Sequence, residues 1–98
     1  MQATLRFRAA AKRADFAALR RRLEADRRDV AAHYELGLAL AGDEAYTSAF
    51  EHLLEAVRID RRHADDGARK ALLELFALLG EDDPRTRDYR QRLSSLLF

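Results

Sequence analysis

Apolar residues recur along most of the chain at intervals of three and four positions, which is the spacing of one face of an α-helix. The stripe is strongest over residues 46–57, where it is apolar enough to occupy the centre of a fold. The pattern predicts an all-α protein with short connections. Helices are expected at about 5–12, from 16 to the DRRD run at 26–29, from 30 to Gly42-Asp43, at about 44–59, from Asp65 or Asp66 to Gly80, and from Pro84 onward.

Residues at the ends of these segments fit the chemistry of helix termini. Asp15, Asp29 and Asp83 each precede a helix, where a carboxylate accepts hydrogen bonds from free backbone N–H groups. Asp83-Pro84 is the strongest local signal, because proline is favoured at the first helical position. Gly80 follows the fifth segment and fits the left-handed residue that ends many helices. These signals support the expected boundaries.

A unit of about 34 residues counted from Val30 reproduces most of the pattern of a tetratricopeptide repeat. Small residues at Gly37 and Ala49 would let two antiparallel helices touch, with leucines filling the space around that contact. The matching positions are Leu36-Gly37, Tyr46, Ala49, Leu53 and Ala56. The departures are His33 in place of tryptophan, Leu40 in place of tyrosine, Arg61 in place of proline, and an early Gly42-Asp43. A generic helical hairpin remains the alternative.

The repeat also organises the rest of the chain. One domain is expected over 1–98, with basic helices at 1–29, the repeat at 30–63 and a C-terminal capping and docking helix pair at 64–98. A core of this size is marginal, and stacked helices are how repeat folds bury enough apolar surface. The predicted architecture is a short right-handed solenoid of tetratricopeptide-like hairpins, with about five to six helices.

Charge is distributed unevenly although the net charge is only +1. Residues 1–29 carry nine Lys or Arg against four Asp or Glu, whereas 30–63 carry three against six and 64–98 carry six against seven. A basic start attracts nucleic acid in some proteins, but here the cations alternate with acids and lack the aromatic side chains that stack on bases. Nucleic-acid binding is therefore not expected.

Candidate catalytic and metal-binding groups are sparse. The chain has no cysteine, which removes thiol chemistry, disulfides and cysteine-based metal sites. The histidines at 33, 52 and 63 lack the spacing of a helical metal site, and no serine or threonine carries the signature of an activated nucleophile. We therefore expect no enzyme activity, no cofactor and no metal.

Neither membrane association nor secretion is expected. The chain has no apolar run of about 18 residues, the length needed to cross a bilayer. Cations interrupt the N-terminal segment LRFRAAAKR, which is unlike a signal peptide. A cytoplasmic location follows as the expectation.

The second half of the chain resembles one family closely. The segment RIDRRHADDGARKALLELFALLGEDDPRTRDYRQRLSSLLF looks like the end of the chaperedoxins (CnoX/YbbN type), in which a tetratricopeptide region follows a thioredoxin-like domain. The resemblance covers roughly residues 15–98. Its most specific pieces are Asp65-Asp66 with Arg69-Lys70, Leu75-Phe76 with Leu79-Gly80, and Tyr89-Arg90 with Leu93 and Leu96-Leu97-Phe98.

The resemblance implies a non-enzymatic part of a co-chaperone that holds unfolding client proteins and passes them to the chaperonin and the DnaK system. In that family the C-terminal helix contacts the chaperonin. This chain would be only the docking half, because it contains no cysteine and no thioredoxin-like domain. The alternative class is a structural tetratricopeptide scaffold that mediates self-association.

The last helix is the expected docking element, because its apolar stripe runs to the end of the segment. The expected anchors are Leu93, Leu96, Leu97 and Phe98, with Arg90 and Arg92 at the rim. In the alternative interpretation Leu93 and Leu96 only seal the fold, and Leu97 and Phe98 face the partner.

Two other binding modes are not expected. Some co-chaperones hold a partner's terminal carboxylate with an asparagine-containing clamp, but this chain has no asparagine. The clamp positions of the repeat hold Ala31, Tyr34, Glu35 and Leu38. Arg69 is expected to pair with Asp65 or Asp66, one turn away, rather than with a partner.

Overall fold

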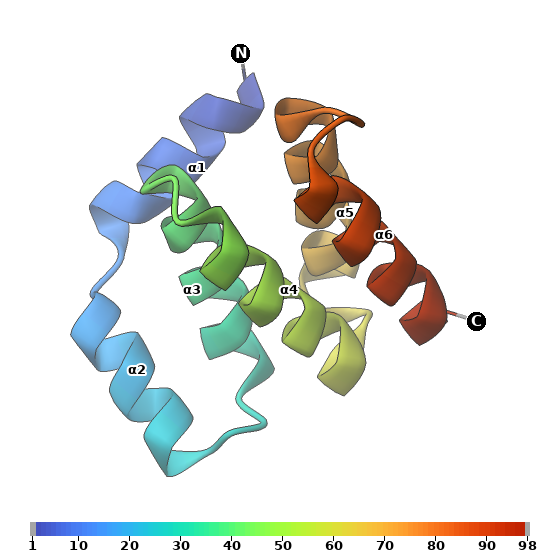
Figure 1. Ribbon diagram of the computed structural model, residues 1–98. Helices are drawn as coiled ribbons and strands as arrows, with labels where there is room; N and C mark the ends of the chain where they lie inside the picture. Colours follow the sequence, from blue (N-terminus) through green and yellow to red (C-terminus); the bar gives the residue numbers. More distant parts are fainter. Residues whose placement is uncertain (1, 98) are drawn as a thin grey trace.

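The computed structural model describes the backbone of residues 2–97 and the side chains of residues 5–97. Within that part of the chain every regular element is a helix, which confirms the all-α class (Figure 1). The helices are α1 (Gln2–Arg13), α2 (Phe16–Ala25), α3 (Val30–Gly42), α4 (Tyr46–Asp60), α5 (His63–Leu79) and α6 (Pro84–Leu97).

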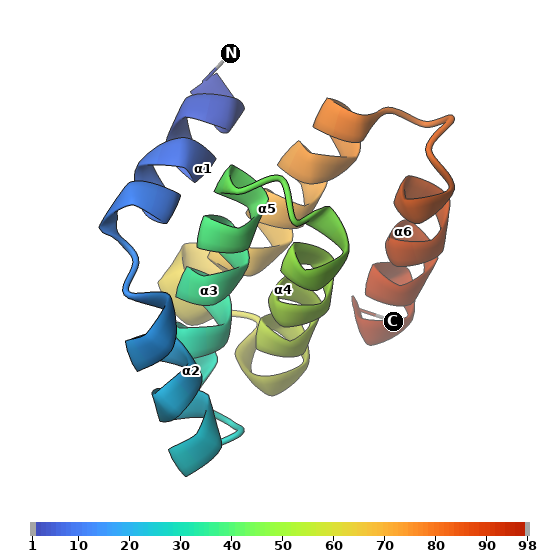
Figure 2. The same ribbon diagram turned by 60° about the vertical axis from the view of Figure 1, so that its left-hand side comes forward.

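The helices stack around the hairpin of α3 and α4, as in a tetratricopeptide-like repeat fold (Figures 1 and 2). The pair α3 and α4 makes the most extensive contact between elements. On one side of this hairpin, α5 packs on both helices, and α6 closes the end by packing on α4 and α5. On the other side, α1 and α2 both pack on α3 rather than forming a hairpin of their own.

Small residues let α3 and α4 approach closely, as the repeat pattern predicts. A side chain at Gly37 would place its Cβ 2.7 Å from Leu53 Cγ and 3.4 Å from the Ala49 carbonyl oxygen. Ala49 and Leu53 are fully buried. Because interiors are packed as densely as crystals, added volume at these positions must displace a neighbour.

Three aromatic rings join α6 to the repeat. Phe50 on α4 is fully buried and stacks on Phe76 of α5, with ring centroids 5.5 Å apart. It also stacks on Tyr89 of α6, with centroids 4.5 Å apart. Stacked rings add to the stabilisation that burial alone provides. The single side chain of Phe50 therefore helps to hold α4, α5 and α6 together.

The expected aspartate caps are confirmed. Each carboxylate accepts a hydrogen bond from a backbone N–H in the first turn of its helix, a group that the helix itself leaves free. Ala18 N donates to Asp15 Oδ1 at 3.0 Å, Ala32 N to Asp29 Oδ1 at 3.0 Å, and Arg85 N to Asp83 Oδ1 at 2.9 Å. Gly80 has a φ of 88°, which favours glycine, but its ψ of 162° is extended rather than left-handed helical.

The start of α5 differs from the expectation. Residues 64–66 have φ values of 54°, 55° and 65°, so the regular helix begins only at Gly67. The Asp66 carboxylate accepts a hydrogen bond from Arg69 Nε at 2.6 Å, and no backbone N–H in the described part of the chain donates to it. The predicted pairing of Arg69 is therefore confirmed, whereas the expected start of the helix at Asp65 or Asp66 is wrong. The Asp66 carboxylate is held by the Arg69 guanidinium.

Two boundaries shift for reasons of packing and backbone conformation. The first helix is longer than expected, because α1 continues along α3 and crosses it at Gly42. A Cβ at Gly42 would lie 2.1 Å from the Phe7 carbonyl oxygen. Glycine at this position therefore lets α1 cross α3 closely, and it also ends α3. The fourth helix begins at Tyr46, later than expected, because Glu44 has a φ of 62°.

Candidate functional site

The structure separates the residues expected to dock a partner. Leu93 is 4% exposed and belongs to the core, and Leu97 is partly buried and packs against that core. Leu96 is 40% exposed and lies on the outer side of α6. Phe98 lies outside the described residues. Of the expected leucine anchors, Leu96 is therefore the one that a partner can reach without moving α6.

Arg92 is already engaged within the molecule. Its guanidinium donates to both carboxylate oxygens of Glu51 on α4, at 2.8 Å and 3.0 Å, and lies 4.9 Å from the centroid of the Tyr89 ring. The Tyr89 hydroxyl donates to the same carboxylate at 2.7 Å. These hydrogen bonds, with Arg92 making the largest contribution, hold the pKa of Glu51 below its ordinary value. The group links α6 to α4 and keeps the last helix in place.

Arg90, the other expected rim residue, also has an internal partner. Its guanidinium donates to Glu81 Oε1 at 2.8 Å and lies 5.3 Å from the centroid of the Phe76 ring. Both Arg90 and Glu81 are exposed, so the ion pair is weak and a partner can replace it.

Two hollows border Leu96, between the second half of α4 and the end of α6. Their volumes are about 290 Å³ and about 520 Å³, and both are lined by Arg58, Ser95 and Leu96. Apolar walls come from Leu54 in the smaller hollow, and from Val57 and Ile59 in the larger one. An exposed leucine beside hollows whose walls are partly apolar can receive side chains of a protein partner.

Two histidines form a pair elsewhere in the fold, which their spacing in the sequence does not predict. His33 on α3 and His52 on α4 face each other with 3.1 Å between their Nδ1 atoms. His33 Nε2 lies 2.9 Å from the Arg27 carbonyl oxygen, to which it donates, so His33 Nδ1 is the acceptor for His52 Nδ1–H. Among the residues described, no group of three or more His, Asp or Glu side chains is arranged to hold a metal ion.

This pair makes stability depend on pH. Burial, followed by the charges of His33 and Arg20, lowers the pKa of His52 below its ordinary value of 6.5, while Glu51 and Glu55 oppose the change. A lowered pKa means that the unfolded chain binds the proton more strongly. The stabilisation is therefore present above pH 6.5 and is lost as the pH falls through the folded-state value. We expect the free energy of unfolding to fall as the pH is lowered from about 7 to about 5.

Urea unfolding at several pH values measures this dependence. His52→Asn keeps a side-chain N–H donor without a titrating ring and should flatten the profile in this window. His63→Asn is the matched control, because His63 lies outside the pair and makes an edge contact with Tyr34. The carboxylates Glu51 and Glu55 do not interfere, because their pKa values lie below 4.5. An unaltered profile in the His52→Asn protein would show that the pair is not the cause.

Two residues at the clamp positions of the repeat, Tyr34 and Glu35, also make contacts within the molecule. The Tyr34 hydroxyl accepts a hydrogen bond from Arg6 at 3.0 Å, and the same arginine pairs with Glu74 of α5 at 2.8 Å. Glu35 accepts from Arg22 at 3.3 Å. The contact between Arg6 and Glu74 joins residues 68 positions apart, and no pattern in the sequence predicts it.

Comparison with known proteins gives one match. A protein-family model described as tetratricopeptide repeat matches residues 9–98. Neither the curated proteins nor the solved structures contain a match to the chain. In the described part of the chain, no helix is both long enough and apolar enough to cross a membrane. Tetratricopeptide repeats are typically protein-interaction modules rather than enzymes, and their stacked helices present extended binding surfaces. With a family model covering most of its length and a helical repeat fold to match, the chain belongs to the tetratricopeptide-repeat family.

Proposed function

We propose that this chain is the docking module of a chaperedoxin-type co-chaperone, and that it binds the chaperonin through the outer side of α6. Membership of the tetratricopeptide-repeat family supports protein binding in general. The resemblance of the C-terminal segment to the chaperedoxins supports the chaperonin as the partner and unfolded client proteins as the cargo. The observation that carries the proposal is Leu96, 40% exposed on the last helix and bordered by two hollows.

Replacing Leu96 with serine tests this proposal. A leucine anchor buried at an interface commonly contributes about 1 kcal/mol or more, so we expect binding to purified chaperonin to weaken about fivefold or more. Biolayer interferometry with immobilised chaperonin measures the change. Leu73→Ser is the matched control, because Leu73 is 44% exposed but lies on α5. Both variants should retain the melting temperature of the intact chain, since surface substitutions have small effects on stability.

The proposal fails if the intact chain does not bind chaperonin, or if Leu96→Ser and Leu73→Ser weaken binding equally. Truncation after Leu96 is a less specific test. Because Leu97 packs against the core, its removal should lower the melting temperature as well as any affinity.

A second candidate function, self-association as a structural scaffold, is favoured by a different surface. Leu5 on α1 is 61% exposed and Leu73 on α5 is 44% exposed. They lie next to Arg6 and Glu74, the ion pair that joins these two helices. If the chain dimerises through this surface, Leu73→Ser should abolish the dimer in sedimentation velocity, and Leu96→Ser should not.

A further inference from the structure

The chain contains the same three-residue turn twice. Asp26-Arg27-Arg28 follows α2, and Asp60-Arg61-Arg62 begins at the last residue of α4, 34 residues later. This spacing equals the period of about 34 residues that defines the repeat. The turns follow this spacing although α1 and α2 do not form a repeat hairpin of their own. Figure 1 shows the ends of α2 and α4 in the lower part of the molecule.

In each turn the aspartate accepts a hydrogen bond from the backbone, and the aspartate and both arginines are exposed. Asp26 Oδ1 accepts a hydrogen bond from Arg28 N at 2.9 Å, and Asp60 Oδ1 accepts one from Arg62 N at 3.1 Å. A carboxylate that closes its own turn in this way stabilises the local backbone. The arginine side chains of both turns are left to face water.

The arginines of these turns also lack acidic partners. Arg27, Arg28, Arg61 and Arg62 are all exposed, and within residues 5–97 none of them forms an ion pair. The opposite holds on α5 and α6, where most of the cations pair with a nearby carboxylate. An edge that keeps its cations unpaired has charge available for a partner.

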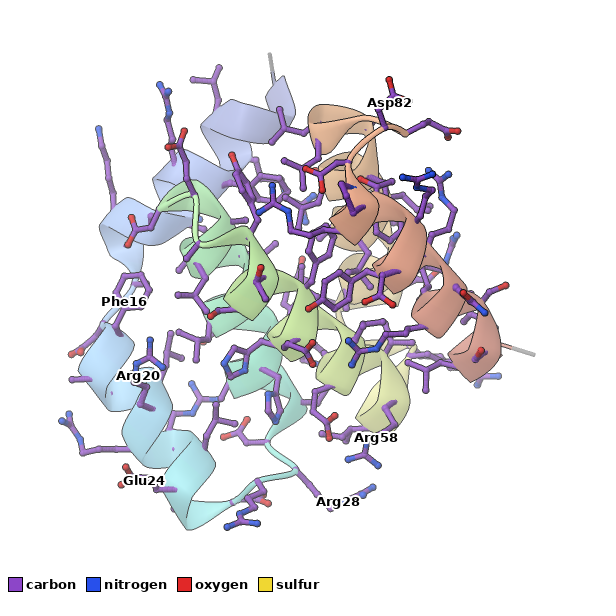
Figure 3. All side chains as sticks on the ribbon, in the orientation of Figure 1. Phe16, Arg20, Glu24, Arg28, Arg58 and Asp82 are labelled. Carbon is purple, nitrogen blue, oxygen red and sulfur yellow. The ribbon has the colours of Figure 1, made fainter. Side chains whose placement is uncertain are left out.

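The two turns lie near the same ion pair on α4. Glu55 pairs with Arg58, and the charge of Arg28 also contributes to lowering the pKa of Glu55. Arg58 lines the larger hollow together with Arg61 and Arg62 of the second turn. Figure 3 shows Arg28, in the turn after α2, and Arg58, near the end of α4, in the lower part of the molecule.

A hollow of mixed polar and apolar lining lies directly beside the second turn. Its volume is about 520 Å³, and its polar walls come from Arg58, Asp60, Arg61, Arg62 and Ser95. Its apolar walls come from Val57, Ile59 and Leu96. No aromatic side chain lines it, so it offers nothing on which a nucleic-acid base would stack. A partner that meets the arginines can bury an aliphatic side chain at the same time.

We propose that this arginine edge, defined as Arg27, Arg28, Arg61 and Arg62, binds an acidic segment of a protein partner. Carboxylates of the segment pair with the guanidinium groups, and one aliphatic side chain enters the hollow beside Leu96. A protein is favoured over a nucleic acid because the hollow has no aromatic side chain on which a base could stack, whereas Val57, Ile59 and Leu96 can contact an aliphatic side chain. The inference does not rest on docking to the chaperonin, because none of the four arginines belongs to α6.

Fluorescence anisotropy with synthetic probes tests the edge. The probe is a short fluorescein-labelled peptide rich in glutamate with one central leucine, and its affinity should fall as salt is added. Replacing all four arginines of the edge with glutamine should weaken binding about tenfold, the sum of several exposed ion pairs. The charge-matched control replaces Arg8, Lys12, Arg21 and Arg87, which are exposed and unpaired elsewhere, with glutamine.

The outcomes separate the alternatives. The control protein should bind the peptide within about twofold of the intact chain, because distant exposed charges are screened. A peptide with serine in place of leucine should bind more weakly than the leucine peptide. Circular dichroism should show the same helix content for every variant.

The inference is overturned if the intact chain does not bind the glutamate peptide, or if the two charge-matched variants lose equal affinity. It is also overturned if a single-stranded oligonucleotide of equal charge binds more tightly than the peptide, which would assign the edge to nucleic acid. Dimers in sedimentation velocity that disappear only in the edge variant would assign the edge to a second copy of the chain. Loss of peptide binding with unchanged chaperonin binding would leave the docking function of α6 intact.

Discussion

Replacing Phe50 with alanine should lower the free energy of unfolding by about 3–5 kcal/mol. The ring is fully buried and stacks on both Phe76 and Tyr89, so its loss removes apolar burial and the contacts of two further rings. Because those partners lie on different helices, the cavity cannot close by a small local movement. Urea unfolding followed by circular dichroism measures the change.

Phe16→Ala is the matched control for this substitution. Phe16 begins α2 and is only partly buried at the margin of the core. Its removal should cost about 1 kcal/mol, the typical value for a substitution that opens no central cavity. Equal losses at the two positions would mean that the aromatic stack does not hold α4, α5 and α6 together.

Replacing Ala49 with leucine should lower the free energy of unfolding by about 1–3 kcal/mol. Ala49 is fully buried where α4 meets α3, and its carbonyl oxygen would lie only 3.4 Å from a Cβ at Gly37. The added side chain must therefore separate two backbones or displace Leu53. Thermal unfolding of the variant measures the effect.

Ala77→Leu on α5 provides the control, because Ala77 is exposed and leucine favours helices as alanine does. Its effect should stay within about 0.5 kcal/mol. A melting temperature unchanged by Ala49→Leu would contradict the close contact of α3 and α4 that defines the repeat. The control shows that any loss comes from the contact and not from the larger side chain itself.

The expected docking residues show that an apolar stripe on a helix does not by itself predict which of its residues face the core. Leu93 and Leu97 are four positions apart and share the face of α6 that packs on the core. Leu96 precedes Leu97 by one residue and is turned from it by about 100° around the helix, enough to bring it to the outside. The sequence marks all three as apolar, but which face is covered depends on how α6 lies against α4 and α5. That orientation comes from the aromatic stack and from the carboxylate of Glu51.

The sequence by itself determined the helices, most of their ends and the close contact of α3 and α4. These features are local or follow a known repeat: each aspartate cap bonds to a backbone group three residues or fewer away, and Gly37 meets Ala49 through a spacing that the repeat prescribes. Interactions within one or two helical turns depend on the spacing of residues in the sequence, so the sequence predicts them.

Only the tertiary structure decided which distant side chains meet. His33 and His52 are 19 residues apart, Arg6 and Glu74 are 68 apart, and Arg92 and Glu51 are 41 apart. The arginine edge likewise arises because stacking brings the ends of α2 and α4 to one side of the fold. Each of these contacts depends on the angle and register at which helices pack, which are set by the sum of many burial contacts rather than by any single spacing in the chain.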